Sequence, residues 1–417
     1  MKRRTLLSVL VALIGAFALL AAGCGGDDEA AGTETGGGGE AQTVKIVSDL
    51  PLQGSSAAQT EQMNNAIQLY LEEIGNKVGN YTIEFEAFDD STAARGAWDE
   101  ATCAANARQY VEDESIVGVI GTFNSGCAAI EVPIANEASL AYVSPANTLT
   151  GLTHEGPGIT PGEPDKYYPT GTRNYARVVT SDDIQGVIDA NYMKDELGVT
   201  SVFILDDKDL YGKGVADAFE QAANDIGLEV AGHEGWDANA QNYKALMTTV
   251  KESGADGIFV GGISCFNGGQ LIKDKVSVVG DNEEVPTVVS DGFVQVSLFE
   301  EAGEEIAEGL YGSAPTLNPE DLPGAGKEFN AKVEEQFGPP EVYTAYAVAA
   351  LQVILAALEA SDGTREGVTE QLFDVSVDTV VGPLSFDENG DPAEKFESIF
   401  QAKSGTWEFV EQVAAPE

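Results

Sequence analysis

The chain has 417 residues, of which 43% are hydrophobic, so it can bury a large core in one two-lobed unit or in two to three domains. Its 69 acidic and 22 basic residues give a formal net charge of −47. A surface this acidic repels the phosphates of nucleic acids and of anionic lipids, so nucleic-acid binding is excluded.

The first 23 residues have the order of an export signal. A basic start at residues 2–4 precedes an apolar run over residues 6–22, and small residues lead directly to Cys24. This order is typical of a secretory signal, and the Ala-Ala-Gly-Cys ending resembles that of bacterial lipoproteins, in which the cysteine carries the lipid. The alternative is an ordinary cleaved signal followed by an incidental cysteine, and Arg3-Arg4 leaves the Sec and twin-arginine routes both open.

Residues 24–42 are rich in glycine, alanine and acidic residues and have no apolar period. Such a composition predicts a flexible tether. With a lipid on Cys24, the chain is expected outside the cytoplasm, either anchored to the outer face of the cell membrane or in a periplasm.

From residue 44 onwards, short apolar runs alternate with amphipathic stretches. Strands are predicted at 44–47, 81–88, 116–121 and 140–143, and helices at 63–74, 97–111 and from about 127. The alternation then starts again, with strands at 201–205, 228–232, 257–261 and 286–290 and helices at 214–226, 243–253 and 268–278. Two such series in succession predict an α/β fold of two doubly wound, parallel, Rossmann-like lobes.

Three further segments complete the prediction. Residues 156–172 are rich in proline and glycine and predict a long irregular loop. Apolar periodicity predicts a helix over 343–358. A strand-turn-strand is predicted beyond it, with its turn at 387–390.

Besides Cys24, the chain has three cysteines, and none has the spacing of zinc ligands. Cys103 falls in a predicted helix and Cys127 lies just after the next strand, so a Cys103–Cys127 disulfide with Cys265 free is the favoured arrangement. Three buried free thiols are the alternative.

The sequence contains no recognisable catalytic motif. Its two histidines lie in unrelated contexts, and no metalloprotease, nucleophile-elbow or phosphate-loop pattern occurs. We therefore predict that the protein is not an enzyme and uses neither a cofactor nor a metal.

Polar residues follow four of the predicted strands, at the carboxyl ends where open α/β sheets bind ligands. Asn124 and Ser125 open a helix whose N–H groups suit a carboxylate, although either side chain could serve only as a helix cap. Residues 144–148 follow the next strand. Tyr211 and Asp291 follow strands of the second series, and an acid at the latter position can pair with an ammonium group.

In their order and spacing, these segments resemble the periplasmic Leu/Ile/Val-binding proteins, the amino-acid branch of the type I solute-binding proteins of ABC transporters. The matching segments are 118–121, 144–148, 206–208, 211–212, 261–262 and 380–384. The resemblance covers the chain from about residue 44 to its end and implies two lobes joined by a hinge of three crossovers. The implied first lobe comprises 43–180 and 315–380, and the second 181–314 and 381–417.

The resemblance also implies ligand contacts at several positions. The expected ligand-binding residues are Ser125, Ala146, Asn147, Thr148, Tyr211, Asp291, Phe123 and Gln59. Phe123 is included because it lies close to Ser125 in the sequence. Ser125 and Thr148, with the backbone near Ala146 and Asn147, are implied to hold the ligand's carboxylate. Tyr211 and Asp291 are implied to hold its ammonium group. Phe123 lines an apolar wall unless it only packs in the core, and Gln59 takes the place of the aromatic residue that often covers the ligand's side chain.

The implied function is capture of an amino acid, branched-chain or otherwise apolar, by closure of the two lobes. The loaded protein, acting as a monomer, would then dock on the membrane subunits of an ABC permease. The alternative is a ligand-sensing ectodomain for small amides or amino-acid-like solutes, coupled to a signalling partner.

Overall fold

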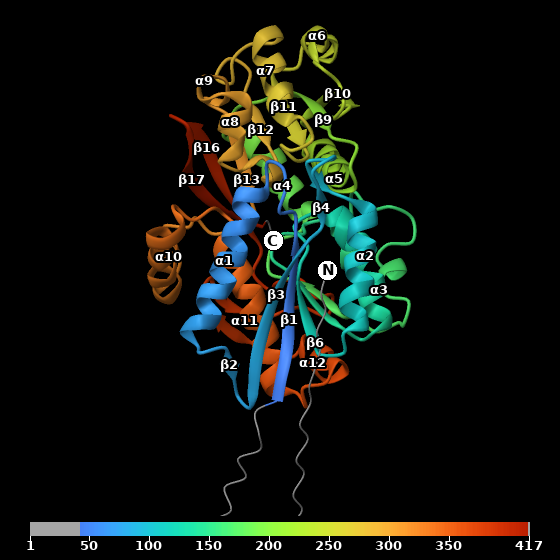
Figure 1. Cartoon of the computed structure of the whole chain (residues 1–417). Helices are drawn as coiled ribbons and strands as arrows, with labels where there is room; N and C mark the ends of the chain where they lie inside the picture. The colour runs from blue at the N-terminus through green and yellow to red at the C-terminus, as the bar shows by residue number, and fades with distance from the viewer. Residues whose placement is uncertain (1–41, 416–417) are drawn as a thin grey trace, which may run out of the picture. The chain divides into compact units, whose positions relative to one another are not determined.

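The computed structural model describes residues 42–415, so the predicted export signal, Cys24 and all but the last residue of the predicted tether lie outside the described residues. The described residues form two large β-sheets with helices on both faces (Figure 1). This arrangement, in a chain that passes between the two sheets three times, confirms the predicted α/β fold class of two Rossmann-like lobes.

The first sheet contains six strands. They are β1 (Gln42–Leu50), β2 (Lys77–Val78), β3 (Tyr81–Asp89), β6 (Ile116–Gly121), β7 (Ala141–Ser144) and β8 (Tyr175–Arg177), in the order β2-β3-β1-β6-β7-β8. All pairs are parallel except β2 with β3. The central strand β6 is buried at every residue, as a strand covered by helices on both faces requires.

Alternate side chains of these strands enter two different cores. Ile120 packs with α1 (Ala57–Glu73) and α11 (Thr344–Ala360), whereas Val119 packs with α2 (Glu100–Glu112) and α3 (Ser125–Glu137). The two-residue period of a strand therefore divides the apolar residues of one run between both faces.

The second sheet contains seven strands. They are β9 (Ser201–Asp206), β10 (Glu229–Gly235), β11 (Gly257–Gly261), β12 (Thr287–Val289), β13 (Tyr311–Ala314), β16 (Phe396–Lys403) and β17 (Thr406–Ala414), in the order β10-β9-β11-β12-β13-β16-β17. The strands are parallel from β10 to β13, but β16 and β17 are antiparallel additions. The prediction of an all-parallel sheet is thus wrong at this edge, where a tight hairpin brings β17 back beside β16.

The second sheet is also covered on both faces. Ile204 packs towards α5 (Leu210–Ile226), which lies against α4 (Asp182–Asp195). Leu205 packs on the opposite face, where α6 (Lys244–Ser253) and α7 (Gly268–Val278) lie. Further strands and α-helices are β4 (Ser91–Thr92), β5 (Ala97–Trp98), α8 (Ser297–Ala302), α9 (Glu304–Ala307), α10 (Gly324–Phe337), α12 (Arg365–Gln371), β14 (Val377–Thr379) and β15 (Gly382–Leu384).

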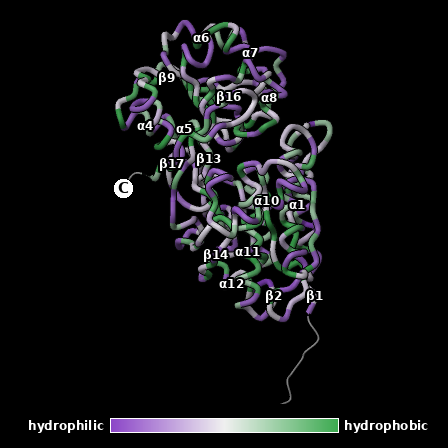
Figure 2. The backbone as a smooth tube through the Cα atoms, turned by 90° about the vertical axis from the view of Figure 1, so that its left-hand side faces the viewer, coloured by the Kyte–Doolittle hydropathy of each residue, from purple (hydrophilic) through white to green (hydrophobic). Residues whose placement is uncertain are grey.

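Helix α11 is buried along most of its length. It contacts β6 and β7 of the first sheet and also α1, which in turn contacts α10 (Figure 2). Among residues 42–415, no single helix is long and apolar enough to cross a membrane, and α11 meets the length and hydropathy criteria only together with α12, across a bend of 111°.

Three crossovers join the two sheets, at residues 178–181, 315–323 and 385–395. The first crossover contacts the first residue of β16, directly after the third crossover, because the Thr180 hydroxyl donates to the Phe396 carbonyl at 2.9 Å and accepts from the Phe396 N–H at 3.2 Å. The resemblance placed the third crossover near residue 381. Since β15 still pairs with β14, and β14 contacts α11, the structure places this return after Leu384.

The strand-turn-strand prediction around residues 387–390 is only partly correct. The turn forms, with the Gly390 N–H donating to the Asp387 carbonyl at 3.1 Å. The residues beside the turn pair only through one isolated antiparallel bridge, between Phe386 and Pro392. The strands beyond it pair elsewhere, since β15 pairs with β14 and β16 inserts between β13 and β17. The true C-terminal hairpin is β16–β17, which sequence reading missed, as it missed α4 and β13.

Candidate ligand-binding site

A cavity lies between the two sheets, at the carboxyl ends of their parallel strands. Its lining comes from both lobes and comprises Phe123, Asn124, Ser125, Ala146, Thr148, Tyr211, Ile263, Asp291, Gly292 and Tyr343. The free volume of this cavity is about 10 Å³, which is room for roughly one water molecule. A larger solute therefore needs the lobes to separate, or the lining side chains to turn, before it can enter.

The first-lobe side of the cavity presents hydroxyl groups and a helix N-terminus. Ser125 is the first residue of α3, and the preceding Asn124 makes no side-chain capping hydrogen bond within the described part of the chain. The Thr148 side chain is 1% exposed, and its hydroxyl has no hydrogen-bond partner among residues 42–415. Free donors at a helix N-terminus suit an anionic group.

The second-lobe side presents Asp291, which is 5% exposed. The Tyr211 hydroxyl donates to its Oδ1, and the Tyr343 hydroxyl donates to its Oδ2 at 2.6 Å. Burial raises the pKa of Asp291, although the two tyrosine hydroxyls counteract part of that rise. An acceptor of this kind suits a cation that restores the charge balance of the site.

Tyr343 is a site residue that the sequence reading missed. It immediately precedes α11, which packs on the first sheet, yet its hydroxyl reaches Asp291 of the second lobe. Its ring also meets Phe123 edge to face, with the ring centroids 5.7 Å apart. No local motif marks this tyrosine, because only its packing brings it to the cavity. Ile263 and Gly292, by contrast, follow the ends of β11 and β12.

Two residues expected at the ligand do not line the cavity. Asn147 lies behind the wall, where its side-chain amide donates to the Thr122 carbonyl at 2.9 Å and its N–H donates to Ser144 Oγ at 2.8 Å. Gln59 lies buried in the first turn of α1, and its side-chain amide has no hydrogen-bond partner among residues 42–415. Phe123 and Tyr343 supply apolar surface to the cavity wall.

A fully buried arginine positions the segment that carries Thr148. Arg177 at the end of β8 donates from Nη1 to the carbonyls of Asn147 at 3.2 Å and Leu149 at 2.9 Å. Its Nε pairs with Asp391 Oδ1 at 2.5 Å. Arg177 thus ties the residues on both sides of Thr148 to the third crossover.

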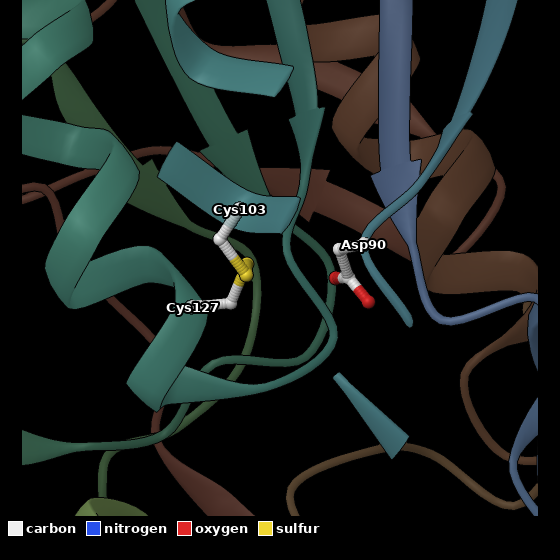
Figure 3. Close-up of side chains that lie close together, drawn as sticks. All are labelled: Asp90, Cys103 and Cys127. Atoms are coloured by element: carbon white, nitrogen blue, oxygen red, sulfur yellow. A yellow bond between two sulfur atoms is a disulfide. The ribbon is translucent and has the colours of Figure 1, made fainter. Parts of the chain in front are cut away.

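The disulfide Cys103–Cys127 joins α2 to α3, with Cα atoms 5.7 Å apart. Figure 3 shows it close to Asp90, whose buried carboxyl oxygens have no hydrogen-bond partner in the described part of the chain. The three side chains are near enough to share a metal ion, but the disulfide consumes both sulfur ligands. Since Cys127 is two residues from Ser125, the disulfide braces the cavity wall.

Replacing Cys103 and Cys127 together by serine is expected to lower the free energy of unfolding by about 3 kcal/mol, because the disulfide closes a loop in the unfolded chain. Urea denaturation of the oxidised protein checks this. Cys265→Ser is the matched control, since Cys265 is the free cysteine of the described residues. An equal loss in both variants would contradict the prediction.

His154 predicts a loss of stability at alkaline pH. Its Nδ1 lies 2.8 Å from Asp391 Oδ2 and its Nε2 3.4 Å from Asp183 Oδ2. Burial alone would lower the pKa of His154, but the two carboxylates raise it to about 9. The ion pairs therefore stabilise the fold fully below the unfolded-state pKa of about 6.5, and this contribution disappears as the pH rises through 9.

The measurement is the melting temperature between neutral pH and about one unit above the raised pKa. The wild type should lose more stability over this interval than His154→Gln, which has no imidazolium to lose. Parallel curves for the two proteins would show that His154 contributes no pH-dependent stability.

Two lobes that enclose a polar cavity at the ends of their parallel strands define a two-lobed solute-binding protein. Comparison with known proteins agrees, since residues 43–406 match the family described as periplasmic binding protein. The chain belongs to this family, whose members bind solutes and are not enzymes. The predicted resemblance to the Leu/Ile/Val-binding proteins is thereby confirmed.

Individual relatives support the same family. The Leu/Ile/Val-binding protein homolog 2 of Brucella abortus is 27% identical over 373 residues, which cover 88% of this chain and 93% of the relative. A branched-chain amino acid transporter substrate-binding protein from Streptococcus pneumoniae, solved with isoleucine, superposes with a TM-score of 0.74 at 22% identity, over 88% of this chain and 99% of that one.

The same fold also occurs with a different ligand. A solute-binding protein of an ABC transporter from Rhodopseudomonas palustris, solved with p-hydroxybenzoic acid, superposes with a TM-score of 0.74 at 18% identity, over 90% of this chain and 98% of that one. At these identities the structural matches show the fold alone. The choice of ligand must therefore be argued from this chain's own side chains.

Proposed function

We propose that the protein is the extracytoplasmic solute-binding component of an ABC importer and captures an amino acid by closure of its lobes. Family membership supports the extracytoplasmic location and the small-molecule ligand. One observation carries the amino-acid assignment: the buried acceptor Asp291 faces, across one cavity, the unpartnered hydroxyl of Thr148 and the helix N-terminus at Ser125.

The two sides of the cavity match the two charges of a zwitterion. Ser125 and Thr148 bind the carboxylate, and Asp291 with Tyr211 binds the ammonium group. An aromatic carboxylate such as p-hydroxybenzoate would satisfy the first side and leave Asp291 buried without a cation. The small apolar surface between the two sides favours a branched-chain or otherwise apolar side chain.

Closure gives such a ligand its affinity. Tyr343 of the first lobe reaches Asp291 of the second, so part of the site exists only when the lobes are together. Excluding water from the closed cavity strengthens each polar contact with the ligand. The ligand shifts the protein towards the closed form by its preference for that form, and the closed form then docks on the permease.

The test is a thermal-shift assay of the purified mature protein against the twenty amino acids, leucinamide, benzoate and p-hydroxybenzoate. An amino acid present at about 100 times its Kd stabilises the native state by about 2.7 kcal/mol and raises the melting temperature. Leucinamide, which lacks the carboxylate, should produce a smaller shift. A shift with benzoate or p-hydroxybenzoate but with no amino acid would contradict the proposal.

The lipid anchor at Cys24 is a separate proposal with its own measurement. Small residues directly before Cys24 and the acidic, glycine-rich segment after it support lipid attachment to a tethered protein. Protein extracted from membranes should then begin at Cys24 and carry the added mass of its acyl chains. Cys24→Ser should remain unmodified, and an unmodified wild type would reject the anchor.

A further inference from the structure

A group of buried carboxyl side chains lies near Asp291, and the proposed ligand contacts do not use it. Asp182 and Asp189 lie on α4, and Glu397 is the second residue of β16. None of these three is more than 1% exposed. We call Asp182, Asp189, Asp291 and Glu397 the acid cluster.

Hydrogen bonds connect the acid cluster to the cavity wall and to the second sheet. The Asp182 N–H donates to the carbonyl of Thr148, which lines the cavity, at 2.8 Å. Further along α4, Gln185 Nε2 donates to Ser313 Oγ at 2.8 Å, and Ser313 Oγ donates to Asp189 Oδ2 at 2.9 Å. The cluster is thus part of the framework behind the ligand site.

Most carboxyl oxygens of the cluster lack a partner. Both oxygens of Asp182, both of Glu397 and one of Asp189 make no hydrogen bond within residues 42–415. The Oε1 atom of Gln185 and the hydroxyl of Ser398, both fully buried, are likewise unpartnered. Ionised carboxylates without partners are costly inside a protein, so such groups retain protons instead.

The members of the cluster also act on one another. Burial, followed by the charge of Asp291, raises the pKa of Asp182 well above its ordinary value. Burial raises the pKa of Glu397 in the same way, and the charges of Asp189, Asp291 and Asp182 add to the rise. Burial and mutual repulsion therefore favour the protonated form of these carboxyl groups.

Groups on the neighbouring elements do not remove this excess of acid. Tyr211 on α5 and Tyr343 before α11 face Asp291 with neutral hydroxyls. Arg177 on β8 is a cation whose charge acts on Asp182. Its guanidinium pairs with Asp391, so it offsets only part of the rise in the pKa of Asp182.

We propose that capture of an ammonium-bearing solute expels a proton from the acid cluster, an inference that rests on the proposed function. The entering R–NH3+ group keeps its three protons and pairs with carboxylate; one carboxyl O–H bond of the cluster breaks, and its proton passes to water. Because the four carboxyl groups share their protons, the release belongs to the cluster and not to one residue.

The expelled proton makes the affinity depend on pH. Acid favours the protonated, empty cluster, so the association constant falls as the pH falls, by up to about tenfold per pH unit. Release of the amino acid is then easiest in an acidic environment, and capture is strongest at neutral to alkaline pH.

Infrared difference spectroscopy of the wild type tests the cluster without relying on any variant. The carbonyl stretching band of protonated carboxyl groups is separate from the carboxylate bands. It should be present in the ligand-free protein at neutral pH and should weaken when L-leucine binds. Glu397→Gln should remove part of the band, whereas Asp195→Asn, at the exposed end of α4, should leave it unchanged.

Isothermal titration calorimetry with L-leucine measures the released proton directly. Titrations in phosphate and in Tris at about pH 7.5, where both compounds buffer, should give different heats because their ionisation enthalpies differ, and the difference gives the number of protons released. Where the thermal-shift assay selects another amino acid, that amino acid replaces L-leucine in the same titrations.

The outcomes separate the two proposals. Equal heats in both buffers for an amino acid that binds would overturn the proton release and leave the proposed function intact. Absence of the protonated-carboxyl band from the free wild type would overturn the acid cluster as a proton store. If none of the twenty amino acids binds, the proposed function fails, and the release step fails with it.

Discussion

Asp291→Asn is expected to weaken amino-acid binding by roughly 30- to 3000-fold, equivalent to about 2–5 kcal/mol. The substitution keeps the size of the side chain and removes the charge that faces the ammonium group. Of the two carboxylate oxygens that accept from the Tyr211 and Tyr343 hydroxyls, one is replaced by an NH2 group. The amine-binding side of the cavity therefore loses its negative charge and one of these hydrogen bonds. Calorimetric titration of the amino acid selected by the thermal-shift assay measures the change.

The same substitution should leave the fold almost unaffected. Burial raises the pKa of Asp291, so its ionised form lowers the stability of the folded protein at pH values above the unfolded pKa. Asp291→Asn removes that cost, and its melting temperature should equal or exceed that of the wild type without ligand. Asp195→Asn is the matched control for binding. Retention of near-wild-type affinity by Asp291→Asn would reject the role of Asp291.

Arg177→Met is expected to lower the free energy of unfolding by about 3–5 kcal/mol, because it leaves the carboxylate of Asp391 buried without its partner. Asp391 is 1% exposed, and the charge of Arg177 is a main cause of its lowered pKa, although burial alone would raise that pKa. Denaturation in urea measures the loss.

Arg177→Met should also weaken ligand binding, since Arg177 fixes the carbonyls on both sides of Thr148. Arg108→Met is the control, because Arg108 is exposed on α2. Replacing Asp391 by asparagine in the same protein should recover part of the lost stability, as the unpaired buried charge is then gone. A loss below about 1 kcal/mol in the single variant would show that the pair is energetically unimportant.

Most elements of the two sheets could be predicted because their periodicity is local. The run at residues 116–121 is apolar at every position, and the structure buries every one of its residues in β6. By contrast, α4 buries the polar residues Asp182, Gln185 and Asp189, so it lacks the apolar periodicity that predicts a helix. Likewise, β16 and β17 become strands of the second sheet only through pairing with β13, which lies far away in the sequence.

The residues of the candidate site, too, could be predicted only in part. Ser125, Thr148, Tyr211 and Asp291 follow strand ends, and the resemblance pointed to them before the structure placed them around one cavity. Tyr343 follows no strand and belongs to no motif, so only the packing of α11 reveals it. Gln59 stays a prediction, because it is buried in the first turn of α1 with an unpartnered side-chain amide among residues 42–415, yet it is not part of the cavity lining.

By itself, the sequence indicated the class of this protein through its two β/α series and the order of the segments that resemble solute-binding proteins, while the export signal stays a prediction. These features are local or compositional and do not depend on how distant segments meet. The tertiary structure alone decided which side chains share the cavity, which arginine positions them and which carboxyl groups are buried together without partners. Those properties depend on distances between residues far apart in the chain, which spacing along a sequence does not specify.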